Sequence, residues 1–215
     1  MVSQTPYRWK IAVRKATLVL VTRNEGKTRE YALLFKGLPL EIRALSEFDG
    51  VPEIREEGDS FEEIAIGKAR QATRLLNIPA IADDSGLEVE ALGGAPGILS
   101  ARYGGEPSDD ARNNRRLREA MRGKDNRRAS FVCAIAIAKP SGQTLIYTGR
   151  CTGEILHEPR GENGFGYDPL FFYPPFGRSF AQLTAEEKSR VSHRGRAMMR
   201  LIDDFEALMV WLDAP

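Results

Sequence analysis

The chain has 215 residues, of which 42% are hydrophobic and 28% are charged, a balance typical of a globular protein with a substantial core. Its formal net charge of +1 excludes the strong overall field that would favour binding to nucleic acid or another polyanion. No apolar run approaches the roughly 20 residues needed to cross a bilayer, so we expect no membrane partner.

The N-terminal residues 1–16 contain several basic side chains but no apolar core of secretory length, and we interpret them as an extension before one domain formed by residues 17–215. The apolar run Thr17–Val21 predicts a buried strand. A polar turn, Thr22–Lys27, follows it, and a helical segment then runs from Thr28 to Phe35. This order brings backbone N–H groups at a helix start to a place where phosphate can bind.

The end of that turn, Gly26-Lys27-Thr28, is similar to the end of a phosphate-binding P-loop. A complete P-loop has a glycine five positions before Gly26, and Val21 stands there instead. The sequence therefore excludes a complete P-loop and leaves two alternatives for Lys27. It directs its charge at a phosphate, or it is a surface lysine at a helix start, where a cation is electrostatically unfavourable.

A second strand is predicted from Leu40 to Leu45, and a long helix begins after Ser60. Ser60 and Glu63 have the spacing of a capping box, so Glu63 alone is better explained as a cap than as a functional acid. The apolar stripe of this helix contains one polar residue, Lys68. Asn77-Ile78-Pro79 ends the helix.

The run Ala80–Leu87 predicts a buried strand that carries Asp83 and Asp84 to its end. Neighbouring side chains on a strand point to opposite faces, so only one of the two carboxylates can face a given site. Carboxylates in this position suit a hard cation such as Mg²⁺, and Asp, Ser and Gly also suit a simple turn.

The remaining pattern predicts a mixed-sheet α/β fold, because strands and helices alternate early and strands pair late. The expected elements are a half-exposed strand over 87–92, a helix over 108–121, antiparallel strands over 129–138 and 144–151, and a helix over 193–212. Cys133 and Cys151 lie in these strands, where we expect reduced, buried thiols and hence a cytoplasmic chain.

Two later segments carry candidate binding groups. In Phe165-Gly166-Tyr167-Asp168, followed by Pro169, aromatic rings flank a glycine and the aspartate is held extended by the proline. Such a loop can stack on a base and hydrogen-bond to its edge, or it can be purely structural. Lys188, His193 and Arg194 bring cations to the start of the last helix, which suits an anion or a carbonyl, or a capped and solvated helix end.

A third segment, 112–128, contains seven arginines and could form a nucleic-acid patch. Acidic residues are interspersed and no aromatic residues interleave. The pattern therefore favours a solvated helix face.

Taken together, six segments resemble the inosine triphosphate pyrophosphatase family, the pyrophosphatases of non-standard purine nucleoside triphosphates. They occur in family order and span about residues 17–212. The matching segments are Thr22-x-Asn24-x-x-Lys27, Ser60-Phe61-x-Glu63-x-Ala65, Ala82-Asp83-Asp84-Ser85-Gly86-Leu87, Gly93-Gly94-Ala95-Pro96-Gly97-x-x-Ser100-Ala101-Arg102-Tyr103, Phe165-Gly166-Tyr167-Asp168-Pro169 and Ser192-His193-Arg194.

The resemblance implies a two-lobed α/β domain with a mixed sheet, flanking helices and an active-site cleft between the lobes. It implies Mg²⁺-dependent hydrolysis of ITP, dITP and XTP to the monophosphate and pyrophosphate, which cleanses the nucleotide pool, and a homodimer. One catalytic domain would then extend over residues 17–215.

The resemblance also implies a role for each matching residue. Asp84 would activate the attacking water and would bind the metal together with Glu63. The other implied contacts are to substrate: Thr22, Arg23, Asn24, Glu25, Gly26 and Lys27 at the triphosphate, Ser85 beside it, Phe165, Gly166, Tyr167 and Asp168 around the base, and Lys188, His193 and Arg194 at the purine edge.

One position departs from the family pattern, because Ile64 stands where bacterial members often have Asn and cannot orient Glu63 through an amide. Two alternatives remain at this stage. The first is a Maf-like pyrophosphatase that acts on pyrimidine or modified nucleotides. The second is a non-catalytic nucleotide- or RNA-binding protein that uses the arginine run, which would leave the acids at 63, 83 and 84 without a role.

Overall fold

A computed structural model describes residues 16–214 of the protein, so the predicted extension lies outside the described residues except for Ala16. The described chain forms one seven-stranded sheet in the order β2-β1-β3-β4-β5-β6-β7. Strand β1 pairs in parallel with β2 and β3, and the remaining pairs are antiparallel. This confirms the predicted mixed-sheet α/β fold.

The strands are β1 (Ala16–Val21), β2 (Leu40–Ala44), β3 (Ala80–Val89), β4 (Arg128–Ala138), β5 (Thr144–Ile155), β6 (Phe171–Tyr173) and β7 (Arg178–Ser179). The helices are α1 (Glu25–Leu34), α2 (Phe61–Leu76), α3 (Asp110–Ala120), α4 (Ala185–Val191), α5 (His193–Asp203) and α6 (Phe205–Asp213). Within residues 16–214, no helix combines the length and apolar character needed to cross a membrane.

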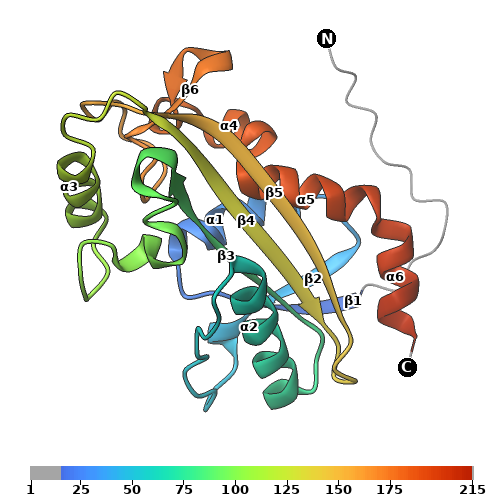
Figure 1. Ribbon diagram of the computed structural model, residues 1–215. Helices are drawn as coiled ribbons and strands as arrows, with labels where there is room; N and C mark the ends of the chain where they lie inside the picture. Colours follow the sequence, from blue (N-terminus) through green and yellow to red (C-terminus); the bar gives the residue numbers. More distant parts are fainter. Residues whose placement is uncertain (1–15, 215) are drawn as a thin grey trace, which may run out of the picture.

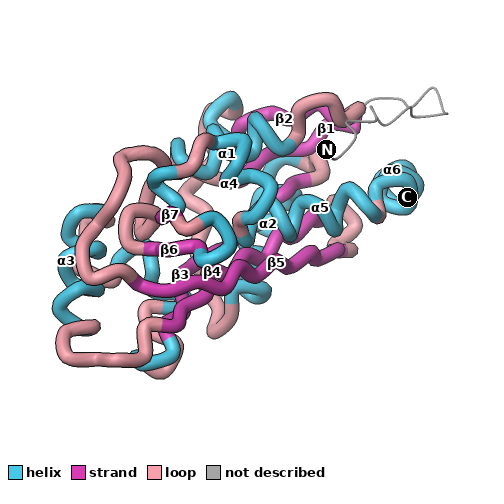
Figure 2. Tube along the Cα trace, turned by 90° about the horizontal axis from the view of Figure 1, so that it is seen from above, coloured by secondary structure: helices cyan, strands magenta, loops and turns pink. Residues whose placement is uncertain are grey.

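The long strands β3, β4 and β5 run diagonally across the molecule, with α3 at one end and α6 at the other (Figure 1). The view from above shows the same separation of α3 from α6 (Figure 2). The hydrophobic core consists of three clusters, which are divided between two lobes. Two lie on opposite faces of the sheet in one lobe, one beneath α1, α5 and α6 and the other beneath α2. The third fills the lobe that contains α3, β6 and β7.

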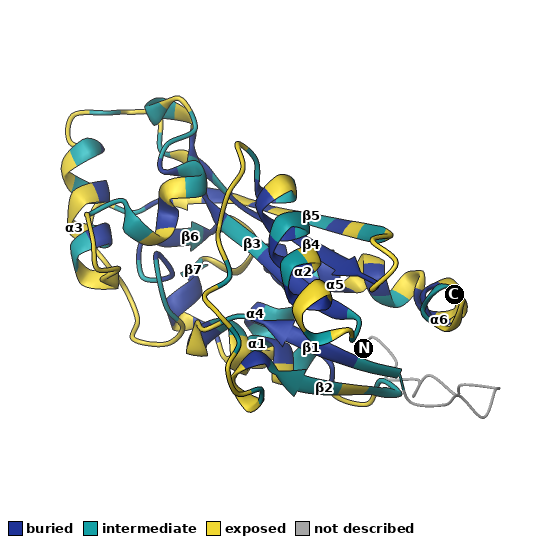
Figure 3. Cartoon of the chain, turned by 90° about the horizontal axis from the view of Figure 1, so that it is seen from below, coloured by how far each residue is buried: buried dark blue, intermediate teal, exposed yellow. Residues whose placement is uncertain are grey.

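Strand β4 is buried over nearly its whole length because helices cover both of its faces (Figure 3). Its alternating residues divide between the clusters: Ile135 joins the cluster under α5, and Ala134 joins the one under α2. Small alanines on the α2 side let that helix pack closely against the sheet. The fold thereby places the middle of β3, the neighbour of β4, at the centre of the molecule.

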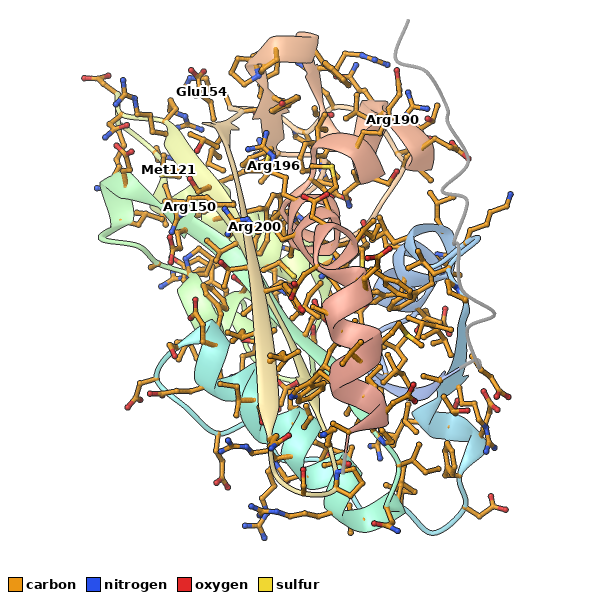
Figure 4. All side chains as sticks on the ribbon, turned by 90° about the vertical axis from the view of Figure 1, so that its right-hand side faces the viewer. Met121, Arg150, Glu154, Arg190, Arg196 and Arg200 are labelled. Carbon is orange, nitrogen blue, oxygen red and sulfur yellow. The ribbon has the colours of Figure 1, made fainter. Side chains whose placement is uncertain are left out.

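The outer edge of β5 is only partly paired, because β6 meets it at Glu154 and Ile155. Side chains from α5 cover part of the remainder (Figure 4). Arg196 donates to the carbonyl oxygen of Arg150 at 3.0 Å, and Arg200 donates to the Thr148 hydroxyl at 3.3 Å. Covering a strand edge with a helix opposes unwanted pairing with other chains.

Two expectations about β3 and the last helix were wrong. Residues 80–89 form one continuous strand, so Asp83 and Asp84 lie inside it, because ten consecutive residues pair with β4. The predicted helix over 193–212 is interrupted at Asp204, whose carboxylate accepts a hydrogen bond from the Tyr147 hydroxyl at 2.8 Å. The pattern also missed the short helix α4, although Thr184 and Glu187 form a capping box at its start.

Gly149 of β5 and Gly67 of α2 should respond in opposite ways to substitution by alanine. A Cβ at Gly149 of β5 would lie 2.1 Å from the His193 carbonyl oxygen and 2.5 Å from the Ala197 nitrogen of α5. We expect Gly149→Ala to lower the free energy of unfolding by about 1–3 kcal/mol or more, because backbone on both sides must move. The measurement is urea unfolding monitored by circular dichroism.

Gly67→Ala in α2 is the matched control, since its Cβ would meet nothing closer than the Glu57 carbonyl oxygen at 3.7 Å. There we expect a gain of up to about 1 kcal/mol from helix propensity. Equal destabilisation by both substitutions would contradict the close packing of α5 on β5.

Candidate active site

A cavity of about 980 Å³ lies between the two lobes. Its wall combines the β1–α1 turn, β3, the segment Gly97–Arg102, the loop before β6, and helices α4 and α5. The volume is at the upper end of the roughly 300–1,000 Å³ that small-molecule sites occupy. Most of the residues predicted for the site line it: Thr22, Arg23, Asn24, Lys27, Asp84, Ser85, Phe165, Gly166, Tyr167, Asp168, Lys188, His193 and Arg194.

Three predicted residues are not among those that line the cavity. Glu25 is exposed and pairs with Arg29 at 3.5 Å. Gly26 is buried beneath Phe165, where a Cβ would lie 2.5 Å from the ring, so the position requires glycine for packing. Glu63 is exposed and accepts a hydrogen bond from the Asp59 N–H at 2.9 Å. Asp59 is the residue before the N-cap Ser60, so in this structure Glu63 contacts backbone at the start of α2.

The turn between β1 and α1 is fixed by its own side chains. The Thr22 hydroxyl accepts a hydrogen bond from the Asn24 N–H at 3.1 Å, and the Asn24 side chain caps α1 by accepting from the Lys27 N–H at 3.0 Å. The turn thus holds Lys27 in the first turn of the helix, and its ammonium group reaches β3.

Asp83 and Asp84 lie on opposite faces of β3, as the alternation of a strand requires. Asp83 is 1% exposed, whereas Asp84 is partly exposed and lines the cavity. Asp84 is therefore the member of the pair that can meet a ligand.

The buried Asp83 carboxylate lies between two cations. Its Oδ1 is 3.1 Å from the Lys27 ammonium, and its Oδ2 accepts from the Nη2 and Nε of Arg194 at 2.8 and 3.2 Å. Burial favours the neutral acid, yet the charges of Lys27, Arg194 and Lys68 together hold the pKa of Asp83 well below its usual range. Asp83 is therefore ionised at neutral pH.

The ion pairs continue from Arg194 to α1 and α4. Glu30 of α1 pairs with Arg194 and, at 2.6 Å, with Lys188, which also contacts Asp168 at 2.5 Å. Burial opposes ionisation of Glu30, but Arg194 and Lys188 lower its pKa to about 2. Alternating positive and negative groups therefore connect Lys27 to Asp168 through Asp83, Arg194, Glu30 and Lys188. We call this set of six residues the charge chain.

The environment of Asp84 has the opposite effect. Burial raises the pKa of Asp84 to about 6, the charges of Asp83 and Glu56 contribute to the rise, and Lys27 and Lys68 oppose it. A carboxylate with a pKa near neutrality can accept a proton and release it again. Asp84 is thus suited to act as a general base.

Glu56 and Lys68 were not predicted, and both line the cavity beside Asp84. The Lys68 ammonium contacts Glu56 at 2.6 Å and donates to the Asp83 carbonyl oxygen at 3.2 Å. The sequence did carry a signal for Lys68, because it is the only polar residue on the buried stripe of α2. Glu56 lies in an acidic loop, and nothing in that pattern distinguishes it from Glu53 or Glu57.

The loop Phe165–Asp168 is held from two sides by α3. The Gly166 N–H donates to Asp110 at 2.6 Å, and its carbonyl oxygen accepts from Asn114 at 2.8 Å. The Tyr167 hydroxyl donates to the Ser100 carbonyl oxygen at 2.8 Å. These contacts fix the backbone of the loop, in which Tyr167 and Asp168 are buried.

His193 is 4% exposed and stacks on Phe131 with ring centroids 4.7 Å apart. Burial, with the positive charge of Arg194 beside it, lowers the pKa of His193 well below its usual value. Its Nδ1 is buried and has no hydrogen-bond partner among the described residues. A neutral imidazole with an unused nitrogen at the cavity wall can recognise a polar edge of a ligand.

Comparison with known proteins identifies the family of this chain. The model of the Ham1 family matches residues 18–204. The chain belongs to the Ham1 family. A "dITP/XTP pyrophosphatase" of Syntrophobacter fumaroxidans is 51% identical over 93% of this chain and 86% of its own length, and one of Desulfotalea psychrophila is 50% identical over 91% and 88%.

Solved structures of Ham1 proteins show the same fold. The Ham1 protein of Coxiella burnetii superposes with a TM-score of 0.82 at 41% identity, covering 89% of this chain and 99% of that one. The similarity therefore extends over both lobes.

The arginine run over 112–128 serves the Ham1 fold in part. Arg112 donates to the Pro107 carbonyl oxygen, and Arg118 donates to the His157 carbonyl oxygen at 3.1 Å. Arg127 donates to the carbonyl oxygens of Met121, Ile155 and Leu156 at 2.8–3.0 Å. These three arginines are occupied by backbone contacts, which weakens the nucleic-acid alternative.

Because the pKa of Asp84 is raised, replacing its carboxylate with a neutral group should increase the free energy of unfolding. The folded state binds this proton more tightly than the unfolded chain, so stability falls as the pH rises from about 4 to 6, and the full cost is present at pH 7.5. In the absence of divalent metal, we expect Asp84→Asn to raise the free energy of unfolding at pH 7.5 by about 2 kcal/mol. Urea unfolding measures this quantity.

The pH supplies the control for this prediction. At pH 4 the native Asp84 is largely protonated, so the advantage of Asn should shrink. An Asp84→Asn protein that is less stable than the wild type at pH 7.5 would contradict the proposed environment.

Proposed function

We propose that the chain is a Mg²⁺-dependent nucleoside triphosphate pyrophosphatase that hydrolyses dITP, ITP and XTP to the monophosphate and pyrophosphate, and so cleanses the nucleotide pool. The principal support is the position of Asp84, a carboxylate of raised pKa that faces a nucleotide-sized cavity beside Lys27 and Lys68. The names of the relatives point to two of these substrates, dITP and XTP.

The carboxylates of the cavity fit a magnesium ion. Within residues 16–214, no group of three or more His, Cys, Asp or Glu side chains is arranged to hold a metal by itself. Mg²⁺ does not need such a group, because it usually binds one or two carboxylates and completes its shell with water and substrate phosphate. We propose Asp84 and Glu56 as these ligands, in place of the pair Asp84 and Glu63. When bound, the ion would withdraw charge from the phosphate oxygens and the leaving pyrophosphate.

The residues of the chain then divide the remaining work. Asp84 accepts a proton from the water that attacks the α-phosphorus. Lys27 and Lys68 stabilise the negative charge that develops on the phosphate oxygens, and their contacts with Asp83 fix them before substrate binds. The turn Thr22–Asn24, with Arg23, lies at the same end of the cavity and would bind the outer phosphates.

Base selection follows from the donors at the other end. Hypoxanthine and xanthine carry a carbonyl at the six position, where adenine carries an amino group. His193 and Arg194 can donate to this carbonyl. The amino group of adenine is itself a donor, so it would leave donors unpaired at a cost of about 1–3 kcal/mol each. Phe165 and Tyr167 supply aromatic surface for the purine, and Ser85 lies between the two ends beside Arg194.

Three further features are also proposals, and of these the homodimer rests on the resemblance alone. We propose that residues 17–215 act as one catalytic domain, that the protein is a homodimer, and that it works in the cytoplasm. The single sheet supports the first, and the free buried thiols of Cys133 and Cys151 are compatible with the third.

The decisive activity assay is a panel of nucleoside triphosphates with Mg²⁺, in which pyrophosphate and orthophosphate are both measured. We expect ITP, dITP and XTP to release pyrophosphate and ATP to be used roughly tenfold to a hundredfold less well, for one mispaired contact. Preference for UTP or dTTP would favour the Maf-like alternative. Release of orthophosphate would contradict the proposed reaction.

The assignment of Asp84 as base and Glu56 as metal ligand predicts different effects for variants of these two residues. Asp84→Asn should lower kcat by about 10²–10⁴, because the base is lost. Glu56→Gln should raise the Mg²⁺ concentration needed for half-maximal activity at least tenfold, since even indirect metal partners cost about 10–100-fold.

Glu63→Gln is the matched control, since it changes a nearby acid that caps α2. It should cost no more than about 1 kcal/mol of stability and leave the Mg²⁺ requirement unchanged. The reverse ranking, with Glu63 more important for Mg²⁺ than Glu56, would restore the original assignment.

A further inference from the structure

Asp83 joins the two ends of the cavity although it does not line it. Lys27 lies at the triphosphate end and Arg194 at the base end, and each contacts a different oxygen of the Asp83 carboxylate. The Cys133 thiol, 3.8 Å from Oδ2, packs against the same buried group. A single side chain that is 1% exposed therefore sets the distance between two cations that would contact opposite parts of one substrate.

Lys27 depends on Asp83 for its direction. Both polar contacts of its ammonium group within residues 16–214 are to Asp83, one to Oδ1 at 3.1 Å and one to the carbonyl oxygen at 3.4 Å. A lysine has a flexible stem and a point charge, so without this anchor it can turn toward another carboxylate. Asp84 is the adjacent residue, and an ion pair between Lys27 and Asp84 would oppose the action of Asp84 as a base.

Arg194 is held more rigidly, and Asp83 contributes two of its contacts. Its Nε and Nη2 both donate to Oδ2 of Asp83, Nη2 also donates to Ser85 at 2.8 Å, and Nη1 pairs with Glu30. The planar guanidinium group is thereby oriented by acceptors on two sides.

We propose that Asp83 is a positioning residue that fixes the triphosphate site and the base site together, so that its charge is needed both for phosphate binding and for base discrimination. This inference rests on the proposed function, because it assigns the two ends of the cavity to the two parts of a nucleotide. Asp83 acts through Lys27 and Arg194 and touches neither substrate nor metal.

Glu30 offers a matched control. It is also a carboxylate in the charge chain, and it also pairs with Arg194, but its second partner is Lys188 at the base end. A variant of Glu30 therefore disturbs Arg194 without removing the anchor of Lys27. If Asp83 served only to support Arg194 or to stabilise the fold, Glu30→Gln and Asp83→Asn would have the same effect on ligands.

The test uses two fragments of the substrate as probes for the full chain in the presence of Mg²⁺. Inorganic tripolyphosphate reports on the Lys27 end and inosine on the Arg194 end, and calorimetric titration gives both dissociation constants. We expect Asp83→Asn to weaken both fragments by roughly tenfold to a hundredfold. Glu30→Gln should weaken inosine and leave tripolyphosphate within about twofold of the wild type.

Turnover gives a second readout that a purely structural role would not change. Relative to the wild type, Asp83→Asn should lower kcat for ITP and reduce the ratio of ITP to ATP hydrolysis, whereas Glu30→Gln should mainly reduce the ratio. A folded Asp83→Asn protein that binds either fragment as tightly as the wild type would overturn the proposal.

Asp83→Asn removes a charge that the partly buried Lys27 and the buried Arg194 share, so Asp83→Glu is included in case the first variant does not fold. The extra methylene keeps the charge but shifts the carboxylate within a closed space, and both fragments should bind more weakly. Wild-type affinities for both fragments in Asp83→Glu would also overturn the proposal. If the wild type binds the fragments but hydrolyses no nucleoside triphosphate, the proposed function fails while the fragment data still test Asp83.

Discussion

The structure depends on the burial of one ionised carboxylate between a lysine and an arginine. Removing Asp83 from water is costly by itself, and it is tolerated because Lys27 and Arg194 occupy its two oxygens. The same interaction draws together β3, the start of α1 and the start of α5, which are far apart in sequence. All three elements contribute to the wall of the cavity.

The charge chain extends this constraint across the base end. Lys27, Asp83, Arg194, Glu30, Lys188 and Asp168 alternate in sign, and every member except Glu30 and Lys27 is at most 6% exposed. Buried charges in such a chain satisfy one another before a ligand arrives, so the site does not reorganise its dipoles during the reaction. This fixed arrangement suits discrimination between two purines that differ in one exocyclic group.

Much of this architecture could be predicted from the sequence. The strand, turn and helix around Lys27 and the paired acids of β3 follow from short patterns in which local preference and tertiary structure agree. Glu63 remains a prediction from the resemblance, and its capping-box spacing was the stronger signal in the sequence; in the structure its carboxylate accepts from the Asp59 N–H. Glu30 and Glu56 could not be found, because each is an ordinary acid in a polar segment and only the fold brings it to the cavity. The break at Asp204 was likewise invisible, because the apolar stripe continues across it.

Adjacent placement of Asp83 and Asp84 on a strand explains how one residue type performs two tasks. Alternation sends one carboxylate to a pair of cations, and its pKa falls. It sends the other to a cavity wall, where burial and the nearby charges of Asp83 and Glu56 raise its pKa to about 6. Groups whose environments push their pKa values apart take different roles in a reaction. Because the charge of Asp83 contributes to the rise at Asp84, the residue that anchors Lys27 also raises the basicity of its neighbour, and a one-residue shift in register would lose both effects.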